Sequence, residues 1–197
     1  MATLANPRLY IKSEGRHKTT HSPISTTTIS PNCPISSKMP TFTITPAETP
    51  KDLTETTTLF KSYGQALNID LTFQDFATEL ATLLGKYSPP TGALLLARTT
   101  TSAAVGCVAL RPLLPPLGVC EMKRLYVSPS ARGMGVGCAL AEAVVLEARR
   151  WGYAAVRLDT LPEMGAAREV YARLGFVEVE AYYETPVEGT VFLELRL

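Results

Sequence analysis

A glycine-rich stretch between a strand pattern and a helix pattern restricts the fold of this chain more than any other feature. The stretch reads Arg-Gly-Met-Gly-Val-Gly and covers residues 132–137. An apolar strand pattern over residues 125–127 precedes it, and a helical pattern over residues 136–151 follows it. A helix that begins inside such a run exposes N–H groups without intrahelical acceptors at the positive end of its dipole. We therefore expect this loop to bind an anion such as a pyrophosphate.

Two well-known nucleotide-binding motifs explain the loop poorly. The phosphate-binding loop of nucleotide hydrolases requires Lys and then Ser or Thr after its glycines, where this chain has Cys138 and Ala139. The dinucleotide fingerprint, counted from Gly133, would need Gly or Ala at position 138. Asp159 partly matches its acidic residue, about 20 positions further on. The preceding strand follows a hairpin, however, so a dinucleotide site is disfavoured, and a plain tight turn is the alternative without a ligand.

Hydrophobic periodicity predicts one mixed α/β domain over residues 41–197. Its first half contains a hairpin that turns at residues 100–102, and its centre reads strand–helix–strand. Thr72 and Asp75 stand at the N-cap and capping-box positions of the second expected helix. The expected strands cover residues 41–45, 92–99, 105–110, 119–127, 154–160, 176–179 and 190–195. The expected helices cover residues 50–67, 72–84, 136–151 and 166–174.

The first 40 residues differ from the rest in composition. They are rich in Thr, Ser and Pro and carry five Lys or Arg residues against one acid, a charge of +4 that leaves −3 for residues 41–197. Such a segment buries too little apolar surface to offset chain entropy, so we expect residues 1–40 to form a disordered tail. Its basic, acid-poor character also fits a leader. We expect a cytoplasmic protein, with organelle import by the first 38 residues as the alternative.

Composition narrows the function classes for the expected domain. Its slightly acidic charge gives no basis for nucleic-acid binding and favours a cationic substrate weakly. No apolar run is long enough for a membrane span. The four cysteines contain no C-x-x-C pair, so we expect no metal site. Both histidines, His17 and His21, lie in the tail, so proton transfer in the domain must use carboxylates, Tyr, Lys, Cys or water.

Three segments together resemble the GNAT superfamily of N-acetyltransferases. Residues 132–137 resemble its R/Q-x-x-G-x-G/A signature, which binds the pyrophosphate of acetyl-CoA. Residues 121–129 look like the family's strand that leads into this loop, and Tyr-Ala-Arg-Leu-Gly-Phe at residues 171–176 looks like its Y-x-x-L-G-F segment, about forty residues downstream. The resemblance is strong over residues 105–179, topological over residues 41–99, and absent from the first 40 residues.

The resemblance implies a fold and a set of binding residues. The fold is a GNAT-like mixed, mostly antiparallel central sheet flanked by helices, with a V-shaped splay between the fourth and fifth strands. Acetyl-CoA is the implied co-substrate. Its pantetheine would lie along the fourth strand, where a backbone N–H of Tyr126 or Val127 would polarise the thioester carbonyl. The implied cofactor-binding residues are Leu125, Tyr126, Val127, Arg132, Gly133, Met134, Gly135, Val136, Gly137 and Leu161.

The resemblance also implies two catalytic residues. Glu121 would remove a proton from the amine, directly or through water, and its alternative is a solvated or ion-paired strand residue. Asp159 on the neighbouring strand is the second candidate. Tyr171 would protonate the leaving thiolate, and its alternative is a core aromatic. Tyr182 and Tyr183, together with Phe73 and Phe76, could line an acceptor pocket or could simply pack.

We expect direct transfer of an acetyl group from acetyl-CoA to a primary amine in a ternary complex. A small-molecule acceptor is favoured over a protein, and the chain is expected to act as a monomer or homodimer. The alternative is a non-catalytic CoA-binding or interaction module. Retention of both Glu121 and Tyr171 argues against that alternative.

Overall fold

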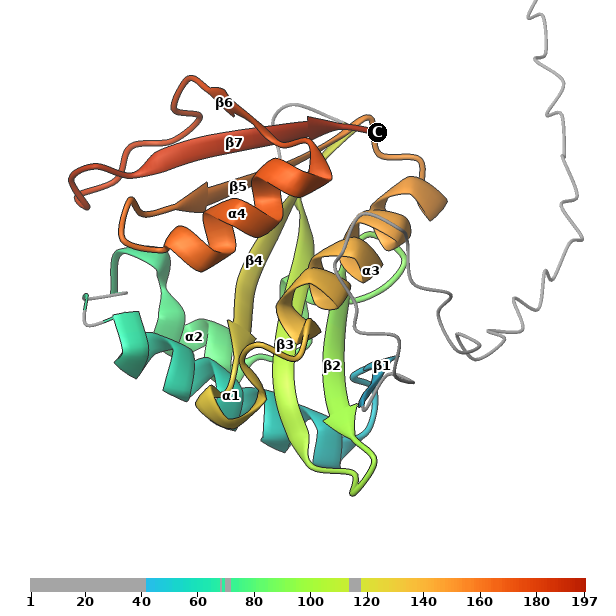
Figure 1. The fold of residues 1–197 in the computed structure, drawn as a ribbon. Helices are drawn as coiled ribbons and strands as arrows, with labels where there is room; N and C mark the ends of the chain where they lie inside the picture. The colour runs from blue at the N-terminus through green and yellow to red at the C-terminus, as the bar shows by residue number, and fades with distance from the viewer. Residues whose placement is uncertain (1–41, 68, 70–71, 114–117) are drawn as a thin grey trace, which may run out of the picture.

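A seven-stranded sheet organises the computed structural model, which describes residues 42–67, 69, 72–113 and 118–197 (Figure 1). The strand order is β1-β2-β3-β4-β5-β7-β6, and every neighbouring pair is antiparallel except β4 and β5. The expected mixed, mostly antiparallel sheet is confirmed. The strands are β1 (Phe42–Pro46), β2 (Ala93–Thr99), β3 (Ala104–Leu113), β4 (Val119–Val127), β5 (Ala155–Thr160), β6 (Val177–Val179) and β7 (Val191–Arg196).

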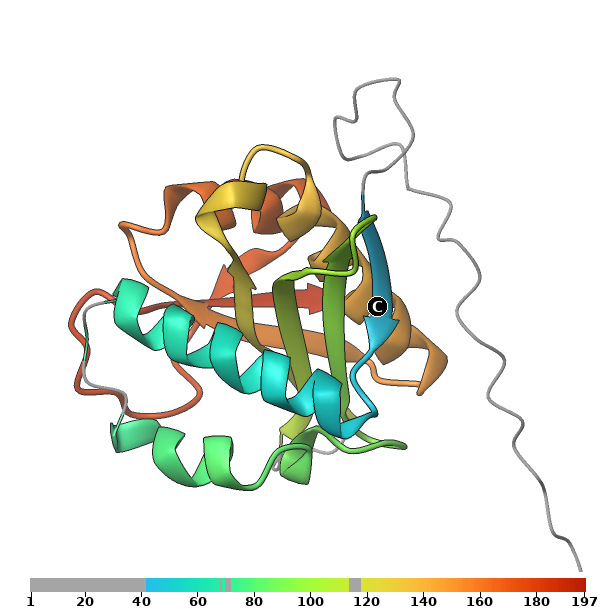
Figure 2. The ribbon, with the colours of Figure 1, turned by 90° about the horizontal axis from the view of Figure 1, so that it is seen from below.

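Helices cover both faces of this sheet. One face carries α1 (Pro50–Leu67) and α2 (Phe76–Ala81), and the other carries α3 (Val136–Arg150) and α4 (Gly165–Leu174) (Figure 2). Three 3-10 turns complete the described elements, namely η1 (Thr72–Gln74), η2 (Gly85–Tyr87) and η3 (Pro129–Ala131). Among the described helices, none combines the length and the apolar composition needed to cross a bilayer.

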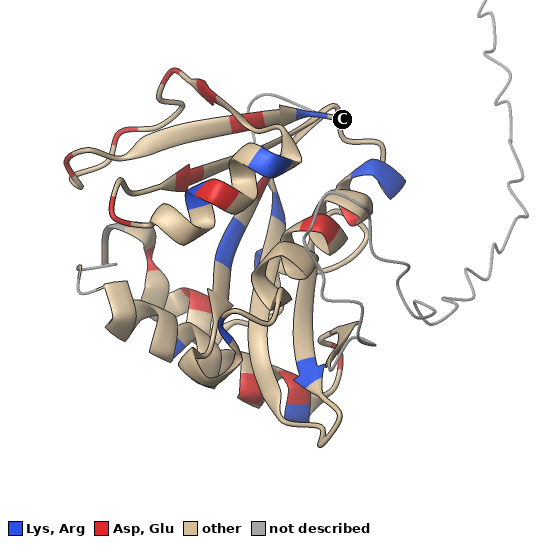
Figure 3. Ribbon diagram, in the orientation of Figure 1, with Lys and Arg blue, Asp and Glu red and all other residues tan. Residues whose placement is uncertain are grey.

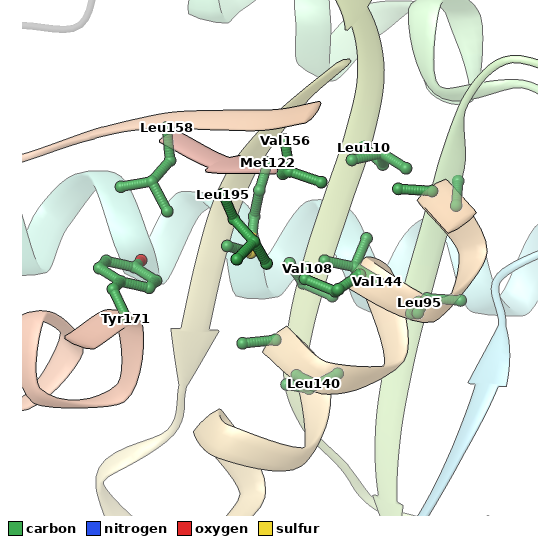
Figure 4. Close-up of a cluster of buried hydrophobic side chains, with 14 of the residues drawn as sticks. Leu95, Val108, Leu110, Met122, Leu140, Val144, Val156, Leu158, Tyr171 and Leu195 are labelled. Carbon is green, nitrogen blue, oxygen red and sulfur yellow. The ribbon is translucent and has the colours of Figure 1, made fainter. Parts of the chain in front are cut away.

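Two hydrophobic cores fill the spaces between the sheet and its helices. They separate because side chains alternate along each strand, so that Val108 and Leu110 face α3 while Cys107 and Ala109 face α1. The α3 core includes Leu95, Val108, Leu110, Met122, Leu140, Val144, Val156, Leu158, Tyr171 and Leu195 (Figure 4). The α1 core includes Leu59, Phe60, Tyr87, Leu94, Leu96, Cys107 and Ala109.

The second helix differs from its prediction. One helix over residues 72–84 was expected, but the backbone of Asp75 is left-handed, with φ of 55° and ψ of 40°. The segment therefore divides into η1 and the short helix α2, and the prediction of a continuous helix was wrong. Asp75 is the N-cap of α2 rather than a capping-box acid. Asp is one of the few residues that adopt this conformation at modest cost, and apolar spacing cannot reveal such a break.

Strands β4 and β5 separate as the splay prediction requires. They pair only where Val119–Glu121 lies beside Ala155–Arg157, although β4 continues to Val127 and β5 to Thr160. A bulge accompanies the separation, because Arg124 has φ of 58° and the register with β3 shifts between Cys107 and Ala109. Lys123 and Arg124 consequently both lie on the α1 and α2 face, where both line one cavity.

The start of α3 approaches β3 closely because of Gly106. A Cβ at this position would meet Leu140 and the Tyr126 carbonyl oxygen at 3.0 Å and Val136 at 3.2 Å. Glycine thus allows the first turns of α3 to pack directly on the sheet. This contact fixes the beginning of α3 beside the end of β4, where the glycine-rich loop lies.

Helix α1 begins at a capping box. The Thr49 N–H donates to Asp52 Oδ2 over 2.9 Å, and the Asp52 N–H donates to Thr49 Oγ1 over 3.2 Å. Arg98 of β2 forms an ion pair with the same carboxylate at 2.5 Å. The beginning of α1 is therefore held to the sheet, and this fixes the direction in which the rest of the helix crosses it.

We expect Asp52→Asn to remove an acid-sensitive part of the stability. Burial acts to raise the pKa of Asp52, but hydrogen bonds from Thr49 and Arg98 outweigh it and lower the pKa from 3.8 to about 2. The ionised group therefore stabilises the fold above about pH 4, and this contribution is lost as the pH falls toward about 2. Urea unfolding followed by circular dichroism should show lower stability for the variant at neutral pH and a flatter profile between these pH values. Glu48→Gln, at a neighbouring exposed position, should retain the parent profile.

Candidate functional site

The glycine-rich loop presents open backbone between η3 and α3. Gly133 and Gly135 both have φ of 78°, a left-handed conformation that favours glycine. A Cβ at either position would meet nothing within 4 Å, so both positions border open space. Gly135 is the N-cap of α3 and provides no capping side chain. The N–H groups of Val136 and Gly137, in the first turn, therefore point outward without an intrahelical acceptor.

Two exposed side chains border the loop. Arg132 donates from Nε to the carbonyl oxygen of Val127 over 3.4 Å, which holds its guanidinium beside the end of β4. Met134 is 41% exposed. A positive helix end, open glycines and an adjacent guanidinium are the properties that a pyrophosphate requires. The loop fits such a group, and binding by these residues stays a prediction.

The strand residues predicted to contact the cofactor line the opening between β4 and β5. Leu125 and Val127 pack toward the α3 core, and Tyr126 lies on the α1 side. The ring of Tyr126 meets that of Tyr63 edge-on, with centroids 6.4 Å apart. Leu161 follows β5 and lines a small cavity of about 20 Å³ together with Tyr63. The predicted strand residues thus border the separation of β4 from β5, and Leu161 lines the small cavity at the end of β5.

Glu121 lies at the last paired position of β4 and is fully buried. Its Oε2 accepts from Nε and Nη2 of Arg111, at 2.7 and 2.6 Å, and its Oε1 accepts from the Tyr182 hydroxyl at 2.9 Å. Lys123 Nζ is 3.8 Å from Oε1. Both oxygens are thus occupied by protein groups. Its role as base is untested, and its geometry is that of an ion-paired residue beneath the opening.

Asp159 faces Lys123 across the opening. The Lys123 ammonium donates to Asp159 Oδ1 over 2.5 Å, which links β4 to β5 beyond their last paired residues. Basic residues lie on β4 and acidic residues on the neighbouring strands (Figure 3). The Asp159 side chain is 20% exposed and lines the small cavity beside Leu161. Asp159 is therefore more accessible to a substrate than Glu121.

Tyr171 projects from α4 toward the sheet, close to Leu158 (Figure 4). It is buried, with its ring centroid 5.7 Å from that of Phe176. Burial raises its pKa, and the proximity of Tyr63 and Asp159 raises it further. Burial likewise raises the pKa of Tyr63 to about 12, opposed by Arg124 and reinforced by Asp159. Tyr63, Asp159 and Tyr171 therefore form one electrostatic cluster at the opening.

A larger cavity of about 400 Å³ lies between α2, the sheet and the loop that joins β6 to β7. On its floor, Arg124 donates to Glu79 over 2.8 and 3.2 Å, and Lys86 pairs with Glu79 at 2.8 Å. Burial acts to raise the pKa of Glu79, but these cations outweigh it and lower the pKa. The lining consists of Gln74, Asp75, Glu79, Lys86, Arg111, Lys123, Arg124, Tyr183 and Glu184.

The expected aromatic pocket forms only in part. Tyr182 and Tyr183 pack edge-on against Phe192, each with centroids 5.0 Å apart. Phe76 instead packs 4.9 Å from the Arg124 guanidinium, and the side chain of Phe73 lies outside the described residues. Tyr183 is the aromatic residue of this group that lines the larger cavity. No cluster of potential metal ligands occurs within the described ranges.

Sequence reasoning missed Tyr63, Arg111 and Lys123 as site residues. Tyr63 follows Leu59 and Phe60 at helical spacing, which indicates burial but not the strand that it faces. Arg111 meets Glu121 only through the register of β3 with β4. Lys123 meets Asp159 because the parallel register of β4 with β5, extended two residues beyond the last pair, places them opposite each other. These contacts depend on tertiary structure that a local pattern does not contain.

Comparison with known proteins gives consistent matches. Residues 57–176 match the acetyltransferase (GNAT) family. An uncharacterised N-acetyltransferase of Schizosaccharomyces pombe is 38% identical over 156 residues, which cover 79% of this chain and 95% of that protein. An uncharacterised N-acetyltransferase of Dictyostelium discoideum is 28% identical and covers 71% of this chain and 92% of its own length.

Solved structures agree with these matches. A Klebsiella pneumoniae structure assigned as an acyl-CoA N-acyltransferase superposes with a TM-score of 0.61 and 30% identity, and covers 79% of this chain and 97% of its own. A GNAT-family acetyltransferase of Staphylococcus aureus has a TM-score of 0.65 at 19% identity, covering 79% and 98% of the two chains. At 19% identity, the match to the Staphylococcus aureus structure shows similarity of fold only.

We expect Arg111→Met to destabilise the protein strongly. The change leaves the fully buried carboxylate of Glu121 without its bidentate partner, which costs about 3–5 kcal/mol in comparable cases. Urea unfolding measures the loss. The double variant Arg111→Met/Glu121→Gln should recover most of it, because Gln is neutral and still accepts from Tyr182. Arg150→Met removes a cation that is 62% exposed and should change stability by less than about 0.5 kcal/mol. Equal effects at the two arginines would contradict the assignment.

Proposed function

Because the chain belongs to the GNAT acetyltransferase family and has its fold, we propose that it transfers an acetyl group from acetyl-CoA to a primary amine, directly within a ternary complex. The observation that carries this proposal is the separation of β4 from β5, which lies beside the open glycine-rich loop and near a small cavity lined by Asp159 and Tyr63. Acetyl-CoA anchored at the loop would extend along β4 and bring its thioester toward Asp159 and Tyr63.

Anchoring of acetyl-CoA falls to the loop and to the free edge of β4. Arg132 and the open backbone of residues 133–137 would hold the pyrophosphate. Beyond Glu121, β4 has no ladder partner from β5 among the described residues, so N–H groups on that edge are free for a ligand. A backbone N–H near Tyr126 or Val127 would then stabilise negative charge on the thioester oxygen. Leu161 would form the opposite wall.

The amine must lose a proton, because an ammonium group has no lone pair. Asp159 is the carboxylate that reaches the opening, and we assign it the role of proton acceptor, directly or through one water. Glu121 then acts as a positioning residue, since its negative charge holds Arg111 and lies 3.8 Å from Lys123, the partner of Asp159. This assignment keeps both carboxylates that the sequence singled out and divides their roles by accessibility.

Tyr171 is the proposed acid for the leaving thiolate. Its raised pKa keeps the hydroxyl protonated throughout the neutral range, which a proton donor requires. A thiol has an ordinary pKa of about 8.5, so the acid accelerates departure of the thiolate without being indispensable to it. The size of the larger cavity, about 400 Å³, supports a small-molecule acceptor over a protein. A non-catalytic CoA-binding module would have no need for this cluster of proton-transfer groups.

We expect Gly135→Glu to abolish acetyl-CoA binding. The new carboxylate would stand at the helix N-terminus and repel the pyrophosphate, so Kd from isothermal titration should rise by about 100-fold or more. Gly152→Glu is the matched control, because Gly152 has φ of 74° and its Cβ would also meet nothing within 4 Å. Both variants carry the same backbone strain, about 1–2 kcal/mol. Binding that survives in the Gly135 variant, or fails equally in both, would contradict the loop's role.

We expect Asp159→Asn to lower kcat by about 10²–10⁴-fold in a thiol-release assay, with little change in stability because Asn still accepts from Lys123. The deficit should shrink as the pH rises toward the pKa of the acceptor amine, since a neutral amine needs no base. Glu121→Gln should lower stability more and kcat less. The roles are reversed if Glu121→Gln has the pH-dependent deficit and Asp159→Asn remains active.

A further inference from the structure

The larger cavity contains polar groups of two kinds. Two carboxylates, Asp75 and Glu184, are exposed at its mouth, where water solvates them. Its other charged lining groups are one acid and four cations, namely Glu79, Lys86, Arg111, Lys123 and Arg124. Of these, Glu79, Lys123 and Arg124 are buried. The sum over these seven lining residues is +1, so a group that enters this cavity meets an excess of cations.

Two of the lining cations retain hydrogen-bond donors that the protein does not use. Arg111 engages Glu121 through Nε and Nη2, which leaves Nη1 for a ligand, and its side chain is 30% exposed. Lys86 makes one ion pair and is 35% exposed. Arg124, by contrast, directs Nε, Nη1 and Nη2 to Glu79 and Gln74 and is 1% exposed. Arg111 and Lys86 are thus the cations available to a ligand.

The Tyr183 hydroxyl adds an unsatisfied donor to the same cavity. Its oxygen is buried and has no partner with hydrogen-bond geometry. Burial raises the pKa of Tyr183, and the charges of Asp159 and Glu121 and a weak hydrogen-bonding interaction with Asp159 raise it further, while Arg111 opposes them. This hydroxyl therefore lies next to Asp159 within the charged cluster and makes no hydrogen bond of good geometry there. A buried hydroxyl without a partner costs free energy, and a ligand that accepts its hydrogen bond removes that cost.

We propose that the acceptor is an amino carboxylate whose carboxylate binds to Arg111, Lys86 and Tyr183 while its amine faces Asp159. This inference rests on the proposed function and names the substrate class for it. A guanidinium, an ammonium and a phenol share one complement, an anionic oxygen group. The bond-forming end must lie toward the opening, and Asp159, which binds Lys123 of the cavity lining, faces that opening.

A carboxylate fits better than the other charged groups that an amine could carry. A second cation on the acceptor would find only the solvated acids at the mouth and would face the unused donors within. A phosphate with two charges exceeds the net charge of +1 on the lining. An uncharged acceptor would leave the buried Tyr183 hydroxyl without a hydrogen bond of good geometry and would make no use of the charge of Arg111.

The test is a thiol-release assay with acetyl-CoA and matched acceptors. Each of the common amino acids is compared with its carboxamide, its decarboxylated amine and its aminophosphonate analogue. We expect kcat/KM for the preferred amino acid to exceed that of its carboxamide by about 10–100-fold. A carboxamide, amine or aminophosphonate that matches or exceeds the acid overturns the carboxylate proposal and leaves the proposed function intact. If acetyl-CoA binds but none of the acceptors supports thiol release, the proposed function itself is overturned.

Tyr183→Phe separates recognition from folding. Because the hydroxyl makes no hydrogen bond of good geometry within the protein and only a weak interaction with Asp159, its removal should leave the thermal unfolding midpoint unchanged or higher. KM for the amino acid should rise about 5–10-fold while kcat stays within about twofold, and the carboxamide should be unaffected. Arg173→Met, on an α4 side chain that is 45% exposed, controls for loss of a cation and should change neither parameter. An unchanged KM in Tyr183→Phe, or equal losses for acid and carboxamide, contradicts the proposed contact.

Discussion

The separation of two parallel strands governs the rest of this structure. After Glu121, β4 and β5 no longer pair, so both lose the ladder hydrogen bonds that would join them. Unpaired strand edges are costly, and the described structure compensates with side chains. Lys123 and Asp159 connect the strands beyond the last pair, while Arg111 and Tyr182 fix the carboxylate at its apex. The two strands are therefore held at the opening by charged side chains.

The bulge in β4 explains how two consecutive cations reach one face. In a regular strand Lys123 and Arg124 would point to opposite faces, and one of them would enter the apolar α3 core. Lys123 already faces the α1 side, and the positive φ of Arg124 turns the guanidinium to the same face, where Glu79 of α2 accepts from it. Burying these ions is expensive unless each is paired and hydrogen-bonded. The network meets that condition, and it fixes α2 over the cavity although α2 is only six residues long.

Features encoded within a few consecutive residues were predictable from the sequence. The glycine-rich loop, α3, α4 and all seven strands have local signatures, and each was found close to its expected range. Asp75 was different, because a left-handed residue inside an apolar helical pattern leaves no periodic trace. The ion pairs of the site were also hidden, since they join residues 10–45 positions apart. The net charge of residues 41–197 also failed to predict the local charge of the cavity. The domain is slightly acidic as a whole, but four cations converge on this one cavity.

Some polar side chains of the site have all their hydrogen bonds within the protein and others do not, and this difference bears on where a substrate would bind. Glu121, Arg124 and Glu79 have their hydrogen-bonding capacity occupied by the protein, so they contribute fixed charge and rigidity. The Tyr183 hydroxyl makes no hydrogen bond of good geometry, and Nη1 of Arg111 is not used by Glu121, although both groups lie in the same cluster. A folded protein retains an unsatisfied buried donor at a cost in stability, and such costs concentrate at functional sites. The proposed acceptor would complete these hydrogen bonds, which is why we place its carboxylate at Tyr183 and Arg111.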